Sequence, residues 1–93
     1  MSLKFLWDSA KATSNRMKHG VSFEEAQTVF YDPLAETNRD ITHSDEEERY
    51  ITIGYSLFGI LLVVIHTDAG DTIRIISARR ATKTEERRYE EGN

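Results

Sequence analysis

Arginine side chains that could bind phosphate stand at the end of an apolar segment, Arg74-Ile75-Ile76-Ser77-Ala78-Arg79-Arg80. An arginine inside an apolar strand is costly unless its guanidinium is paired or faces a cleft. Its planar fork of donors matches phosphate oxygens, although a structural salt bridge to one of the many acids would also satisfy it. Strict alternation places Arg74 and Arg79 on opposite faces of a strand, so both can serve one site only if the backbone turns near Ala78.

Two further groups could take part in acid–base chemistry. Lys18 and His19 stand at the end of a predicted helix, where Lys18 could bind phosphate and His19 could carry a proton near neutral pH. Cations at a helix C-terminus can equally serve only as caps. Glu48-Arg49 precedes a predicted strand and could form an acid/base and anion pair or an ordinary surface ion pair.

A metal site is the alternative for Asp40 and His43, which lie close to four acids at positions 45–48. We do not favour it, because no second histidine lies nearby and a run of acids is typical of a solvated face. The chain has no cysteine, which excludes thiolate catalysis and cysteine-ligated zinc. Phosphate-loop, dinucleotide-binding and serine-hydrolase motifs do not occur either. We therefore predict no metal and no cofactor.

The length of 93 residues fits one domain, residues 1–93. The formal charge of −4 argues against broad non-specific binding of nucleic acid but leaves room for a local anion site. The acid-rich middle, residues 22–48, offers a face that a basic partner could cover. The apolar run at positions 60–65 is too short for a membrane span, and the N-terminus is too short and too soon charged for a signal peptide. We expect a cytoplasmic protein with no membrane contact.

Local signals predict the helices that must position these residues. Asp8 can cap a helix over 9–18 that ends at Gly20, which takes a left-handed conformation without strain. Ser22 and Glu25 form a capping box for a second helix, which Asp32-Pro33 ends.

The strands follow from alternation and turn residues. A short strand over 3–6 and a possible one over 34–37 accompany three clear strands over 50–55, 61–66 and 72–76, which form an antiparallel meander with the apolar 61–66 segment in the centre. Thr82 caps a last helix to about residue 91. The fold class is therefore α+β, with two N-terminal helices, an antiparallel β-meander and a C-terminal helix, the helices packing on one face of the sheet.

These residues together resemble the BrnT family over nearly the whole chain. The matching segments are Phe5-Leu6-Trp7-Asp8, Asn15-x-x-Lys18-His19-Gly20-Val21-Ser22-Phe23-Glu24-Glu25-Ala26, Val29-Phe30-x-Asp32-Pro33, Glu48-Arg49, Ile53-Gly54-x-Ser56, and Arg74-Ile75-Ile76-Ser77-Ala78-Arg79 followed by Ala81 and a helix ending at Tyr89. The resemblance implies a RelE-like fold and the toxin of a type II toxin–antitoxin pair, which cleaves RNA and stops translation. It also implies a BrnA-like antitoxin that neutralises the toxin, binds operator DNA through a ribbon-helix-helix-like domain, and represses the operon with it.

Metal-independent cleavage of RNA needs a base on the 2′-hydroxyl, cations on the phosphate, and an acid for the leaving 5′-oxygen. On this resemblance, the candidates are Arg74 and Arg79 for the phosphate with Lys18 in support, Glu48 as base, and His19 or His43 as acid.

Two alternatives stay open at this point. The chain could be a non-catalytic binding partner and co-repressor of a ribbon-helix-helix-like antitoxin, with arginines that are structural. It could also be a relative that has lost catalysis, since Ile60 stands where many relatives carry a basic residue. Cleavage of RNA by the purified chain without added metal would distinguish an enzyme from a binding partner.

Overall fold

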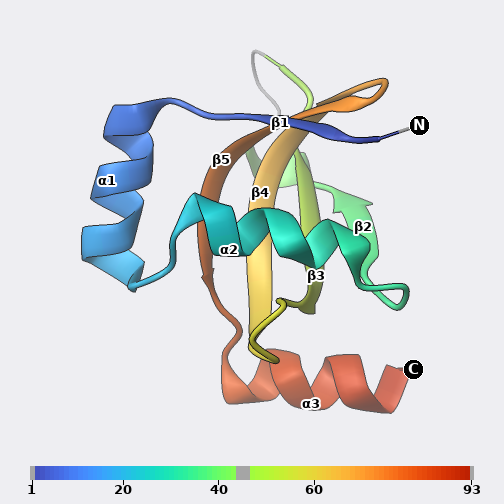
Figure 1. Cartoon of the computed structure of the whole chain (residues 1–93). Helices are drawn as coiled ribbons and strands as arrows, with labels where there is room; N and C mark the ends of the chain where they lie inside the picture. The colour runs from blue at the N-terminus through green and yellow to red at the C-terminus, as the bar shows by residue number, and fades with distance from the viewer. Residues whose placement is uncertain (1, 44–46, 93) are drawn as a thin grey trace.

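The computed structural model describes residues 2–43 and 47–92 and has a five-stranded sheet at its centre, in the order β1-β5-β4-β3-β2 (Figure 1). The elements are β1 (Lys4–Leu6), α1 (Ser9–His19), α2 (Phe23–Thr28), the 3₁₀ turn η1 (Val29–Tyr31), β2 (Glu36–Arg39), the 3₁₀ turn η2 (Ile41–His43), β3 (Tyr50–Tyr55), β4 (Leu61–Ala69), β5 (Thr72–Arg80) and α3 (Lys83–Gly92). The strands β2 to β5 form an antiparallel meander, and β1 pairs with β5 in parallel. The predicted α+β class is confirmed, with β1 making the sheet mixed.

The ends of the first two helices follow from local hydrogen bonds. Asp8 Oδ1 accepts a bond from the Lys11 amide at 3.0 Å, and α1 ends at Gly20, whose φ is +72°. Ser22 Oγ accepts a bond from the Glu25 amide at 3.0 Å and begins α2. Each cap satisfies backbone groups that the helix itself cannot pair.

The core lies between these two helices and one face of the sheet. Alternate positions of β4 and β5 meet the apolar side of α2, and the buried cluster comprises Val21, Phe23, Ala26, Val29, Leu62, Val64, Ile73, Ile75 and Ala78. Trp7 packs edge-on against Phe23, with ring centroids 5.9 Å apart. Ile60 also packs against this cluster, so an apolar residue at that position contributes to the core.

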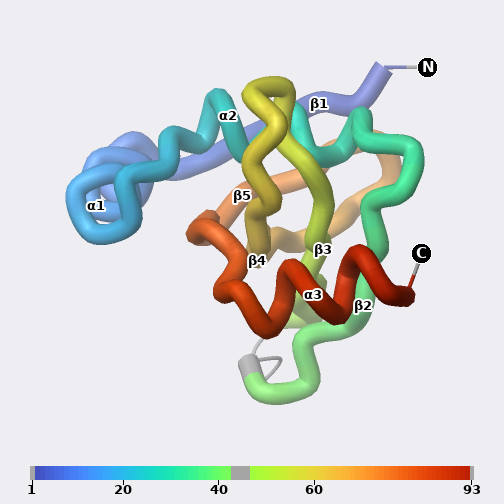
Figure 2. The backbone as a smooth tube through the Cα atoms, turned by 90° about the horizontal axis from the view of Figure 1, so that it is seen from below, coloured from blue at the N-terminus to red at the C-terminus, as the bar shows by residue number. Residues whose placement is uncertain are grey.

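The last helix departs from the predicted arrangement, because α3 crosses the end of the sheet instead of lying beside α1 and α2 (Figures 1 and 2). The predicted capping box is present: the Thr82 amide donates to Glu85 Oε1 at 2.8 Å, and the Glu85 amide donates to Thr82 Oγ1 at 3.1 Å. Tyr89 is the buried residue of α3, and its hydroxyl donates to the Leu34 carbonyl at 2.8 Å. Burial and the nearby Asp32 carboxylate raise the pKa of Tyr89 to about 12. The helix docks at the end of the sheet because α1 and α2 already cover the face of the sheet that carries the core.

Among the described residues, no helix has the length and apolar character needed to cross a membrane.

His66 is a buried polar side chain on the core face of β4, only 1% exposed. Its Nε2 lies 2.7 Å from Thr52 Oγ1, which lies 2.7 Å from Thr37 Oγ1. The Phe30 ring and the imidazole meet in a T-shaped arrangement, with their centroids 4.8 Å apart. Burial lowers the pKa of His66 below its usual value of 6.5, so the fold favours the neutral imidazole.

We therefore expect acid to destabilise the fold through His66. Because folding lowers the pKa of His66, this histidine is protonated first in the unfolded chain as the pH falls. The stability that the neutral imidazole contributes to the fold is therefore complete above pH 6.5 and is lost as the pH falls toward the lowered pKa. The free energy of unfolding should fall by up to about 1.4 kcal/mol per pH unit in this window. Urea unfolding between pH 7.5 and 5 would measure it.

The control for this effect is a second histidine. His66→Gln should flatten the pH dependence, whereas His19→Gln, which changes an exposed side chain, should leave it unchanged. An unaltered slope in His66→Gln would show that other groups cause the acid sensitivity.

Candidate functional site

A β-bulge in β5 brings the two candidate arginines to the same face of the sheet. Arg74 pairs with Thr67 and Arg79 pairs with Val63 on β4, and the register shifts between them. Thr67 and Val63 are four residues apart on one strand, so their side chains share a face, and so do those of their partners. Ile76 is the extra residue on β5. The expectation of opposite faces from strict alternation is wrong, and the departure from alternation lies at Ile76 and not at Ala78.

The shared face is the one that points away from the core. Ile75 and Ala78, the neighbours of the two arginines along β5, are buried in the core cluster under α1 and α2. Arg74 and Arg79 therefore lie on the opposite side of the sheet. We call this side the open face; its residues along β5 and β4 include Arg74, Ser77, Arg79, Ile65, Thr67 and Val63, of which Val63 is buried.

Glu47 contacts Arg74 on the open face. Glu47 Oε1 lies 2.6 Å from Arg74 Nη2 and 4.0 Å from Arg49 Nε. The hydrogen bond from Arg74 lowers the pKa of Glu47 below its usual value, and the charges of Arg49 and Lys11 act in the same direction. Arg74 thus presents its guanidinium to an anion at an accessible position, since 39% of its side chain is exposed.

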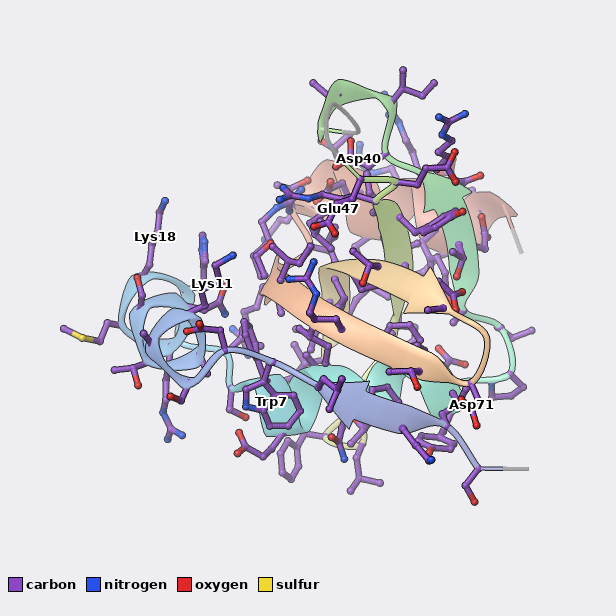
Figure 3. The ribbon with its side chains drawn as sticks, turned by 90° about the horizontal axis from the view of Figure 1, so that it is seen from above. Trp7, Lys11, Lys18, Asp40, Glu47 and Asp71 are labelled. Carbon is purple, nitrogen blue, oxygen red and sulfur yellow. The ribbon has the colours of Figure 1, made fainter. Side chains whose placement is uncertain are left out.

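Two lysines of α1 point to the same side of the molecule as this position. Lys11 and Lys18 are seven residues apart, which puts them on the same side of the helix two turns from each other. Figure 3 shows both side chains pointing away from α2, toward the side of the sheet on which Glu47 lies. Arg74 of β5, Arg49 before β3 and Lys11 of α1 thus bring positive charge to Glu47 from three parts of the chain.

Arg79 is held by α3. Its Nη1 and Nη2 donate to the two carboxylate oxygens of Glu85 at 2.8 and 2.9 Å. The bidentate contact with Arg79 is the main cause that lowers the pKa of Glu85 to about 2. This ion pair links the end of β5 to the first turn of α3, so the guanidinium of Arg79 has a structural partner on the open face.

We expect Glu85→Gln to lower the free energy of unfolding at neutral pH by about 1 kcal/mol, because solvent screens a pair of this exposure. Glutamine keeps the capping bond to Thr82 but loses the charge. A carboxylate with a lowered pKa stabilises the fold above its usual value of 4.5, and this is lost as the pH falls toward about 2. The difference in free energy of unfolding between wild type and Glu85→Gln should therefore vanish over that pH range in acid unfolding titrations. Glu86→Gln, one residue along on an exposed position, is the control and should show no such difference.

Glu48 lies apart from the arginines of β5. Its Oε1 is 3.1 Å from Arg39 Nη2, and its Oε2 accepts a hydrogen bond from the Tyr50 hydroxyl at 3.1 Å. Arg39 and Tyr50 are strand partners. The structure therefore brings Glu47, and not Glu48, into contact with Arg74.

The histidines predicted as acids are not joined to this group by any contact in the described residues. His19 is exposed at the end of α1, and the side chain of His43 lies outside the described residues. Their proton-transfer role stays a prediction. Asp40 is 3% exposed, and its Oδ1 accepts a bond from the Thr42 amide at 3.2 Å. Among residues 2–43 and 47–92, no group of three or more histidine and acidic side chains is placed to hold a metal ion.

Sequence reasoning missed two members of the site, Glu47 and Lys11. A signal for Lys11 exists in the seven-residue spacing to Lys18, which already predicts a shared helix side. No such signal separates Glu47 from Glu48, because both lie in the segment before β3, which begins at Tyr50.

Comparisons with known proteins identify similar chains. The family model described as the ribonuclease toxin BrnT of type II toxin–antitoxin systems matches residues 7–85. The 1.1 Å crystal structure of the Brucella abortus ribonuclease toxin BrnT is 26% identical, with a TM-score of 0.63, and the match covers 88% of this chain and 100% of that one. No curated protein sequence matches the chain significantly.

Proposed function

Because the chain belongs to the BrnT family of ribonuclease toxins of type II toxin–antitoxin systems, we propose that it cleaves RNA on the open face, with Arg74 holding the scissile phosphate. The observation that carries this proposal is the 2.6 Å contact between Arg74 Nη2 and Glu47 Oε1. In this contact the partly exposed guanidinium of Arg74 donates to an oxygen anion. A phosphate oxygen can take the same kind of bond from the remaining donors of the fork.

Glu47 is our candidate for the base. It would accept the proton of the 2′-hydroxyl while the 2′-oxygen attacks phosphorus and the bond to the 5′-oxygen breaks, leaving a 2′,3′-cyclic phosphate and a 5′-hydroxyl. The lowered pKa of Glu47 keeps it ionised. A phosphate bound to Arg74 would partly neutralise that arginine and so raise the pKa of Glu47 toward its usual value, which strengthens the base when substrate is present.

The lysines of α1 supply attraction for the RNA backbone. The charge of Lys11 helps to lower the pKa of Glu47. Lys18 points to the same side of the molecule (Figure 3). Positive charge at several points along a strand of phosphates aids association and makes it sensitive to salt. His19, at the end of the same helix, stays the predicted acid for the leaving 5′-oxygen.

RNA is the substrate and a cognate antitoxin is the protein partner that membership of a type II toxin family implies. We further propose that the reaction takes place in the cytoplasm and stops translation. We propose that the antitoxin is a BrnA-like protein, and that it carries the contact with operator DNA.

The test is cleavage of a defined RNA by the purified chain, separated from antitoxin, in buffer containing a chelator of divalent metals. The expected products carry a 2′,3′-cyclic phosphate and a 5′-hydroxyl. A chain that is folded and free of antitoxin but leaves RNA intact would refute catalysis and favour the non-catalytic co-repressor.

A further inference from the structure

The turn between β3 and β4 exposes large apolar side chains at a position where turns usually carry polar ones. Leu57 is 79% exposed and Phe58 is 71% exposed. Tyr31, at the end of η1, is 63% exposed and lines one shallow hollow of about 520 Å³ together with Tyr55 and Leu57. We call these four residues the turn patch: Tyr31, Tyr55, Leu57 and Phe58. Tyr31, Leu57 and Phe58 are exposed and Tyr55 is partly exposed. Large side chains gathered in this way are typical of a surface that binds another protein.

The turn patch is held in place by side chains of α2. Thr28 Oγ1 accepts a hydrogen bond from the Leu57 amide at 2.9 Å. Ser56 Oγ donates to Glu25 Oε2 at 2.8 Å and accepts from the Phe58 amide at 3.3 Å. Figure 2 shows the turn projecting toward α2. Because the backbone is already ordered, a partner that covers these side chains does not have to fix the turn first.

Negative charge surrounds the turn patch. Asp32 lines the hollow, Glu25 binds Ser56, and Glu90 Oε2 accepts a hydrogen bond from the Tyr55 hydroxyl at 3.0 Å. None of these three carboxylates forms an ion pair within residues 2–43 and 47–92. The hydrogen bond to Glu90 is the main cause that raises the pKa of Tyr55, and the charges of nearby acidic groups act in the same direction. A basic partner would therefore be attracted here, and a second copy would bring like charges together.

We propose that the turn patch is the docking site of the cognate antitoxin, through a segment that presents apolar side chains to the hollow and Lys or Arg side chains to the surrounding carboxylates. The proposal rests on the family assignment, because the family implies an antitoxin. It does not depend on the catalytic residues proposed above. The turn joins β4 at Leu61, six residues from the partner of Arg74 at Thr67, which is a separation of roughly 20 Å along the strand.

The experiment measures binding of the purified full-length antitoxin to the full-length chain by calorimetry. The double substitution Leu57→Ser with Phe58→Ser should weaken binding at least about tenfold, because two large apolar side chains no longer leave water. Met17→Ser is the matched control, since Met17 is 84% exposed on α1, and it should change affinity by less than about threefold. Glu90→Lys should weaken binding and reduce its salt dependence, whereas Glu91→Lys, the next position of α3, should change neither.

The same variants separate this proposal from the catalytic one. The Leu57→Ser, Phe58→Ser chain without antitoxin should melt and cleave RNA like wild type, and it should no longer be inhibited by antitoxin at concentrations that silence wild type. Undiminished antitoxin binding by this chain would overturn the proposal. Wild-type self-association that the double substitution abolishes, with antitoxin binding retained, would instead make a second copy the occupant. If wild type fails to cut RNA, the proposed function fails while the binding comparison still decides the docking site.

Discussion

Replacing Arg74 by alanine should lower RNA cleavage by about a hundredfold or more, because one preorganised donor to the charge that develops in the transition state is lost. The contact with Glu47 is a surface ion pair, with 39% and 45% of the two side chains exposed, so its loss should change the stability little. The variant should therefore stay folded. Initial rates on a defined RNA, together with a thermal melt, would measure both effects.

Arg80→Ala is the matched control, since Arg80 is an exposed arginine at the end of the same strand. It should keep near wild-type activity. The adjacent acids offer a second comparison: Glu47→Gln should reduce the rate and flatten the acid side of its pH profile, whereas Glu48→Gln should have little effect. A folded Arg74→Ala chain with full activity would show that the phosphate is held elsewhere. A strong loss in Glu48→Gln alone would restore the original assignment of the base.

Replacing Asn15 by alanine should lower the free energy of unfolding by about 3 kcal/mol, because it leaves several buried backbone groups without partners. Asn15 is 7% exposed. Its Nδ2 donates to the carbonyls of Val21 at 3.0 Å and of Ala78 at 2.8 Å, and its Oδ1 accepts from the Ala78 amide at 3.1 Å. β1 pairs only with the first residues of β5. At Ala78, beyond the end of β1, the Asn15 side-chain amide bonds the backbone groups of β5 in place of a neighbouring strand.

Ser14→Ala is the control for this prediction, because Ser14 is the exposed neighbour on the same helix and alanine suits a helix at least as well. Urea unfolding of both variants would give the difference in free energy. If Asn15→Ala unfolded at the wild-type urea concentration, the attachment of α1 to β5 would have to depend on apolar packing alone.

The sequence was sufficient where the determining contacts are local. Asp8 and Gly20 define the ends of α1 through bonds within four residues, and Ser22 caps α2 by accepting from the Glu25 amide, as predicted. The second half of the predicted box is replaced by a distant contact, because the Glu25 carboxylate accepts from the Ser56 hydroxyl. The alternating and apolar segments likewise determine the meander and its central strand. The chemistry of Arg74 was also readable, because a guanidinium inside an apolar strand needs an anion wherever it points.

Partners distant in the sequence were decided by the tertiary structure alone. The bulge at Ile76 arises from the register of β5 against β4, and it reverses the side on which Arg79 would otherwise lie relative to Arg74. Glu85 takes Arg79 because α3 turns back against the sheet, and Glu47 meets Arg74 across 27 residues. Residue types determine that a guanidinium needs an anion as its partner. Strand register and helix docking are properties of the whole packed chain, and these determine which carboxylate reaches the guanidinium.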